Sequence, residues 1–158
     1  MNPIKPVKKI LSHTTFAAAP AAAVFPLLCP VREYDWISDW ECTLLRSDSG
    51  FNELHCLFET DIGPLGRETW LTIRYEPSTR VEFVRSSADW LVHYTITLAE
   101  DEQSTAITWT MVLTGLTQKG NQNITGMTRE VYEGIMNRLG ESMAYYLKHG
   151  ECLPRATR

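Results

Sequence analysis

Residues 124–149, with the sequence ITGMTREVYEGIMNRLGESMAYYLKH, have the pattern of one long amphipathic helix. At about 100° per residue, side chains spaced three and four apart fall on one apolar stripe. The stripe consists of Ile124, Thr128, Val131, Ile135, Leu139, Ser142 and Tyr146. Gly150 follows at the position of a helix-ending glycine. The pattern predicts a helix that packs its stripe on another layer of structure.

Three hydroxyl groups interrupt the apolar stripe of this predicted helix. They belong to Thr128, Ser142 and Tyr146. A hydroxyl group buried in a dry core needs a hydrogen-bond partner, so these positions indicate that part of the stripe faces a cavity.

Most of the chain before residue 124 alternates between apolar and polar residues, which is typical of β-strands. Residues 7–16 predict a first strand, and two short helices are predicted at 17–28 and 30–37. Six further strands are predicted near residues 40–44, 54–59, 68–75, 81–85, 90–98 and 107–113. Turns or loops are predicted between them, including 61–66 and 118–123. The prediction is an α+β fold, a seven-stranded antiparallel sheet covered by the last helix.

Length and composition fit one domain spanning residues 1–158, with 153–158 as a flexible tail. A net charge of −4 argues against a nucleic-acid-binding protein. No apolar run approaches the roughly 20 residues of a membrane span. The N-terminal run is too polar for a signal peptide, and the four cysteines lack disulfide-like spacing, so a cytoplasmic protein is expected. No His or Cys pair has metal-ligand spacing, and neither a metal nor a cofactor is expected.

Residues 24–40 (VFPLLCPVREYDWISDW), with 70–75 (WLTIRY) and 108–115 (TWTMVLTG), resemble a bacterial branch of the START-like, or SRPBCC, superfamily. That superfamily includes pollen-allergen-like proteins, polyketide cyclase-like proteins and the activator of the Hsp90 ATPase. The resemblance implies a helix-grip fold, in which a curved antiparallel sheet wraps a long C-terminal helix and two short helices cap one end. It also implies a cavity between sheet and helix, which superfamily members use for lipids, quinones or polyketides.

Candidate ligand-binding residues come from three parts of the predicted fold. The inward strand faces supply Phe58, Tyr94, Trp109 and Met111, and the rim near the short helices supplies Tyr34, Trp36 and Trp40. The helix supplies Met127, Thr128, Val131, Ile135, Ser142 and Tyr146. The same residues could also build a dry aromatic core. Which face of the strands at 68–75 and 81–85 points inward stays open.

The sequence favours a protein that binds a hydrophobic or aromatic small molecule. It contains no GxSxG, phosphate-loop or HExxH motif, and no catalytic residue is assigned. A cyclase, dehydratase or hydrolase is the alternative, for which Glu68, Arg74 and Tyr94 are the candidate titrating groups; Glu68 and Arg74 are expected to share one strand face. A protein-interaction module like the Hsp90 activator is a third hypothesis. The oligomeric state stays open.

Overall fold

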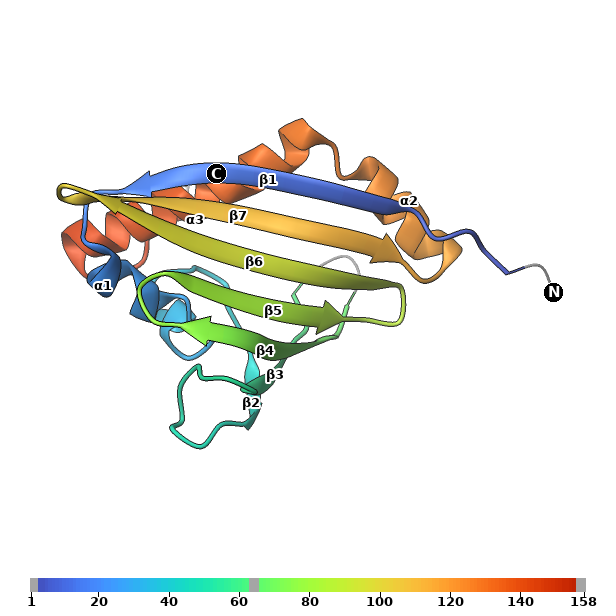
Figure 1. Ribbon diagram of the computed structural model, residues 1–158, viewed down its shortest axis with the longest axis horizontal. Coiled ribbons are helices and arrows are strands. Elements are labelled where there is room, and N and C mark those ends of the chain that lie inside the picture. Colours follow the sequence, from blue (N-terminus) through green and yellow to red (C-terminus); the bar gives the residue numbers. More distant parts are fainter. Residues whose placement is uncertain (1–2, 63–65, 156–158) are drawn as a thin grey trace.

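The computed structural model describes residues 3–62 and 66–155 (Figure 1). Strand β1 (Lys8–Ala17) is followed by helix α1 (Ala21–Val24) and two 3₁₀ helices, η1 (Phe25–Leu27) and η2 (Arg32–Asp35). Six strands come next: β2 (Thr43–Arg46), β3 (Leu57–Thr60), β4 (Glu68–Glu76), β5 (Arg80–Ser86), β6 (Trp90–Asp101) and β7 (Ser104–Gly115). Helices α2 (Gln118–Gly126) and α3 (Arg129–His149) end the chain. The predicted α+β class and the order of elements are confirmed. Parts of the predicted 61–66 loop and of the predicted tail lie outside the described residues.

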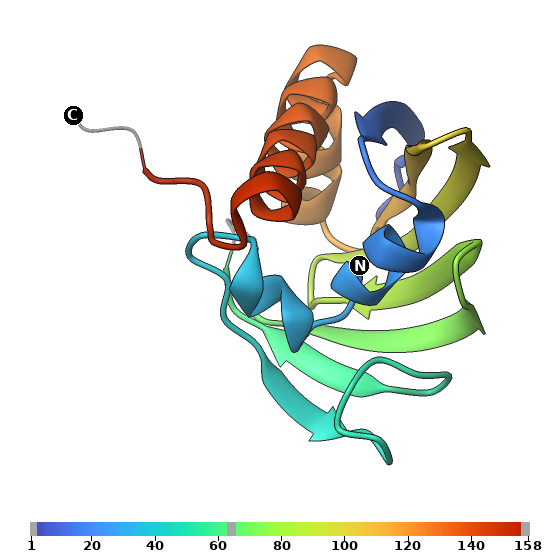
Figure 2. The same cartoon turned by 90° about the vertical axis from the view of Figure 1, so that its left-hand side faces the viewer.

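The strands form one antiparallel sheet in the order β1-β7-β6-β5-β4-β3-β2. The sheet curves, and α3 lies across its concave side (Figures 1 and 2). Pairs such as Tyr94–Met111 and Ile96–Trp109 put large side chains on the concave face. The neighbouring threonine pairs, Thr95–Thr110 and Thr97–Thr108, occupy the convex face. The strand alternation of the sequence therefore predicted the covered face of these two strands correctly.

The C-terminal helix is two helices, so the single helix predicted from Ile124 and the loop predicted at 118–123 are both wrong. The break falls at Met127 and Thr128. Thr128 has an extended backbone, and its hydroxyl accepts a hydrogen bond from the Val131 N–H. It is therefore the N-cap of α3, where a threonine satisfies a free backbone donor. At the other end Gly150 has φ 73°, as predicted for a helix-ending glycine.

The break also rotates the buried face of α3 away from the predicted stripe. Tyr132, Met136 and Met143 are buried, whereas Val131 is 47% exposed. The Tyr132 hydroxyl donates to the Trp109 carbonyl oxygen at 2.7 Å, which fixes α3 on β7. Periodicity counted from Ile124 runs through the cap and therefore gives the wrong phase for the first turns of α3.

A bulge in β4 decides which of its side chains point inward. The pairing of β4 with β5 shifts register between Thr72 and Arg74. Glu68, Trp70 and Thr72 are buried before the bulge, and Arg74 is exposed beyond it. The prediction that Glu68 and Arg74 share one face is wrong, because an extra residue reverses the alternation.

The segment between β1 and β2 closes one end of the sheet, below α3 in Figure 2. Trp36 holds it in place: the side chain is 1% exposed, and its indole N–H donates to the Leu27 carbonyl oxygen at 2.9 Å. No helix in the described part of the chain is both long and apolar enough to cross a membrane.

Candidate functional site

A cavity of about 220 Å³ lies between the concave sheet face, α3 and the segment around η2. The η2 segment contributes Glu33, Trp36, Ile37 and Trp40. The sheet contributes mainly aromatic and long apolar side chains, namely Phe58, Trp70, Phe83, Tyr94, Ile96, Trp109 and Met111. Helix α3 contributes Ile135, Met136 and Leu139. The walls are thus predominantly apolar, as in small-molecule sites.

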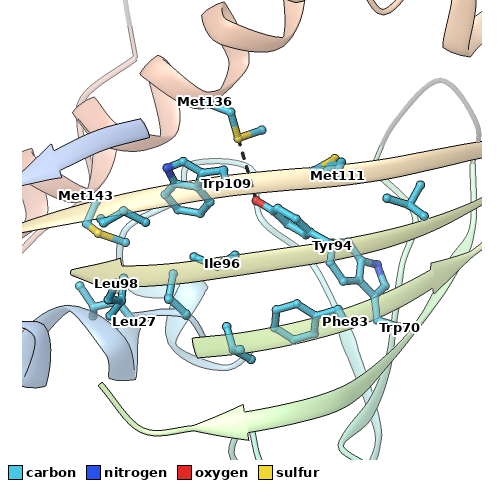
Figure 3. Packing of buried hydrophobic residues seen from close by; sticks show 14 of the residues in the cluster. Leu27, Trp70, Phe83, Tyr94, Ile96, Leu98, Trp109, Met111, Met136 and Met143 are labelled. Atoms are coloured by element: carbon cyan, nitrogen blue, oxygen red, sulfur yellow. Dashed lines mark hydrogen bonds between the residues drawn. The ribbon is translucent and has the colours of Figure 1, made fainter. Parts of the chain in front are cut away.

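Aromatic rings pack against one another along the sheet wall (Figure 3). Phe58 and Trp70 stack with ring centroids 5.3 Å apart, and Phe83 meets both edge-on. The indole N–H of Trp70 donates to Thr60 Oγ1, and that of Trp109 donates to Thr15 Oγ1, each at 2.9 Å. Because these donors are already used, the rings form a fixed apolar wall.

One partly buried ion pair, between Arg85 of β5 and Glu68 of β4, lines the cavity. Arg85 donates to both carboxylate oxygens of Glu68, at 2.6 and 3.0 Å, and the Trp90 indole N–H donates to the same carboxylate at 2.8 Å. The Arg85 guanidinium also lies 4.4 Å from the centre of the Trp70 ring. Among the described residues its Nη1 has one weak hydrogen-bond partner, Met111 Sδ at 3.9 Å, so N–H groups remain for a ligand.

Two polar groups of the cavity lack a strong partner. The buried Tyr94 hydroxyl lies 4.0 Å from Met136 Sδ, a weak acceptor (Figure 3). Burial raises the pKa of Tyr94 well above its usual value. None of the hydrogen bonds or ion pairs among the described residues involves the Glu33 side chain, and its carboxyl oxygens keep some access to solvent. Glu33 as a whole residue is only half-buried, yet loss of water around its carboxyl group raises its pKa to about 8.

The structure brings together about half of the residues predicted to bind a ligand. Those that line the cavity are Trp36, Trp40, Phe58, Tyr94, Trp109, Met111 and Ile135. Those that lie outside its wall are Tyr34, Met127, Thr128, Val131, Ser142 and Tyr146. Ligand contact by any of these residues stays a prediction, because no ligand is present.

The residues outside the wall have other contacts or positions. Tyr34 is exposed; its hydroxyl donates to the Cys42 carbonyl oxygen and accepts from the Cys42 N–H. Tyr146 accepts a long hydrogen bond from Arg32, at 3.4 Å. Thr128 and Tyr146 carry two of the hydroxyls that were predicted to face a cavity. The Thr128 hydroxyl instead caps α3, and the Tyr146 hydroxyl accepts the hydrogen bond from Arg32.

Sequence reasoning missed Glu33, Arg85, Trp70, Phe83 and Met136. Arg85 had a usable signal, because it lies two residues after Phe83 and therefore shares its strand face, which is otherwise apolar. Glu33 had none, because it lies in a run of charged residues, which normally faces solvent. Among the residues that the structure describes, no group of three or more His, Cys, Asp or Glu side chains could hold a metal ion.

No protein-family model and no curated protein matches the sequence. The structure is similar to norcoclaurine synthase from Thalictrum flavum, solved with dopamine and hydroxybenzaldehyde, at 12% identity and a TM-score of 0.66 over 91% of this chain and 89% of that one. It is similar to the Zhui aromatase/cyclase from Streptomyces sp. R1128, at 10% identity and a TM-score of 0.65 over 93% and 100%.

It is also similar to DynU16, a putative protein of the dynemicin biosynthetic locus, at 16% identity and a TM-score of 0.62. The match covers 90% of this chain but about half (48%) of that one. Identities this low show the fold alone. The structural matches confirm the helix-grip fold that the resemblance to polyketide cyclase-like and START-like proteins implied.

Proposed function

We propose that this protein binds a hydrophobic or aromatic small molecule, such as a lipid, quinone or polyketide-like compound, between the sheet and α3. The observation that carries the proposal is the aromatic-walled cavity of about 220 Å³. Burial of apolar ligand surface would supply most of the affinity, at roughly 25 cal/mol per Å² before the costs of ordering. Arg85, Tyr94 and Glu33 would orient the ligand, because each has hydrogen-bonding capacity left unused. A cytoplasmic location is part of the proposal, since all four cysteines are free thiols.

The proposal is tested by a thermal-shift screen with fatty acids, sterols, quinones, flavonoids and aromatic polyketides. A ligand at about 100 times its dissociation constant adds about 2.7 kcal/mol to stability, a shift of several degrees. A hit is then repeated on Ile135→Trp, whose added ring would fill the cavity. The matched control is Val131→Trp, one turn earlier on α3 and outside the wall.

We expect the shift to disappear in the Ile135 variant and to persist in the Val131 variant. A shift that persists in a folded Ile135→Trp protein would place the site elsewhere. Absence of any shift across the panel would contradict binding of these compound classes.

The alternative is an enzyme of the cyclase, dehydratase or hydrolase type. It is favoured by a specific observation: four groups that can donate or accept protons or hydrogen bonds, Glu33, Glu68, Arg85 and Tyr94, line one apolar cavity. Incubating each thermal-shift hit with the protein and analysing it by mass spectrometry separates the two functions. Conversion that requires the protein and is lost in Ile135→Trp would establish an enzyme, whereas unchanged ligand would support binding alone.

A further inference from the structure

Glu33 is held in the cavity wall by its backbone. Its N–H donates to the Cys29 carbonyl oxygen at 2.9 Å, and its own carbonyl oxygen accepts from the Trp36 and Ile37 N–H groups. These bonds fix the backbone of the turn that carries Glu33. No hydrogen bond among the described residues reaches its carboxyl group, whose oxygens keep some access to solvent.

The charges of the cavity leave Glu33 without a counter-ion. Arg85 is neutralised by Glu68, at 2.6 Å. Helix α3 contributes only Ile135, Met136 and Leu139 to the wall, and β6 contributes the hydroxyl of Tyr94. The other nearby titratable group is the Cys42 thiol, whose pKa is raised mainly by burial and slightly by Glu33. An ionised Glu33 is therefore left without a counter-ion among the described residues.

The other walls of the cavity suit an organic cation. Trp36, Trp40, Tyr94 and Trp109 line the same space as Glu33. Aromatic rings attract cations electrostatically, most strongly in places that exclude water. A carboxylate without a partner among aromatic side chains is a combination that recognises an alkylammonium group attached to an apolar body.

We propose, building on the ligand-binding function above, that the ligand is a hydrophobic or aromatic amine whose ammonium group pairs with Glu33. Its apolar part lies against the aromatic wall formed by Trp70, Phe83 and Trp109. This assignment narrows the ligand class from any apolar molecule to one that carries a basic nitrogen.

Binding of an ammonium ion beside Glu33 should release the proton of its carboxyl group. With a pKa of about 8, the free protein holds this carboxyl group largely protonated at pH 7. Binding of an ammonium ion favours the carboxylate, so the carboxyl proton passes to solvent as the ion pair forms. Below pH 8 the affinity for an amine then rises about tenfold per pH unit. It levels off between pH 8 and the pKa of the amine, about 10.

The test uses two probes of the same shape, 2-phenylethylamine and 2-phenylethanol, in calorimetric titrations at pH 6, 7 and 8. We expect the amine to bind about tenfold tighter at pH 7 than at pH 6, and the alcohol to bind equally at both. In Glu33→Gln the amine should lose this pH dependence and at least tenfold in affinity at pH 8. Glu59→Gln is the matched control, because Glu59 lies outside this cavity and pairs with Arg67.

Equal affinity for the two probes at pH 8 would overturn the amine assignment and leave binding in the cavity standing. Equal affinity of Glu33→Gln and the unaltered protein for the amine at pH 8 would likewise overturn the amine assignment and leave binding in the cavity standing. If neither probe binds, the amine assignment also fails, and the cavity proposal is then judged on the compound panel with the Ile135 and Val131 variants.

Discussion

Two glutamates of one cavity are in opposite situations. Glu68 receives three hydrogen bonds, two from Arg85 and one from Trp90. Glu33 receives none from the described residues, and its pKa is raised to about 8. Glu68 is therefore held by its neighbours in the cavity wall, whereas Glu33 keeps the free carboxyl group on which the amine proposal rests. The difference comes from the elements around them, since the residue type is the same.

The raised pKa of Glu33 predicts how its replacement changes stability with pH. Between its usual value, 4.5, and about 8, the folded protein holds a proton that the unfolded chain has released. This group therefore makes the protein less stable as pH rises through that window. Glu33→Gln removes the effect. We expect it to raise Tm by several degrees at pH 8.5 and to leave Tm unchanged at pH 4.5.

Thermal denaturation of both proteins, followed by circular dichroism at pH 4.5 and 8.5, measures this difference. Subtracting the Tm of the unaltered protein from that of the variant at each pH cancels the contributions of the other titrating groups. A Tm difference that is the same at both pH values, or a lower Tm for the variant at pH 8.5, would contradict the assigned environment of Glu33.

Residues of the cavity wall show how far a sequence predicts this candidate site. The inward positions of Tyr94, Trp109 and Met111 follow from strand alternation, because both strands are regular and each has one apolar face. Glu33 cannot be found in this way. Its neighbours Arg32 and Asp35 form an exposed ion pair at 2.9 Å, and only the tertiary fold turns Glu33 toward the cavity.

Among the elements, α3 forms one side of the cavity. Tyr132 anchors it to β7, and Gly140 brings it close to β1: a Cβ on Gly140 would lie 3.0 Å from the side chain of Thr15. Thr15 also accepts the indole hydrogen bond of Trp109. A change at this crossing is therefore transmitted to the aromatic wall of the cavity.

Two glycines of α3 give a matched pair of substitutions. A Cβ at Gly134 meets no atom within 4 Å. Gly134→Ala should therefore stabilise the protein by about 0.5–1 kcal/mol, because alanine is the better helix former. Gly140→Ala should lose this gain and destabilise by about 1 kcal/mol through contact with Thr15. Urea denaturation measures both; equal stabilisation by the two substitutions would show that α3 does not approach β1 as described.

The elements also show which patterns a sequence reveals. The amphipathic character of residues 129–149 is visible, and so is their end at Gly150. The break at Thr128 is not, because a threonine cap within a periodic run has the same pattern as a continuous helix. The bulge after Thr72 is hidden for a similar reason, since one extra residue in β4 does not disturb the composition of the strand.

For the whole molecule, the fold was predictable and the site was predictable in part. The order of one strand, short helices, six strands and a final helix allows few arrangements, and the resemblance selects one of them. The cavity instead depends on where three separate elements meet: the η2 segment, the concave sheet face and α3. Small errors in the phase of α3 were enough to place Val131 in the predicted site and to omit Met136.

The central claim, that a ligand occupies this cavity, is tested most directly by NMR of methionine methyl groups. The chain has five methionines; Met111 and Met136 line the cavity, whereas Met127 and Met143 do not. Protein labelled with ¹³C at these methyl groups is titrated with the strongest hit of the compound panel, and signals are assigned with single Met→Leu variants. We expect the Met111 and Met136 signals to shift with saturation and the Met127 signal to stay in place. Saturable binding that shifts Met127 and leaves Met111 and Met136 unchanged would contradict the account.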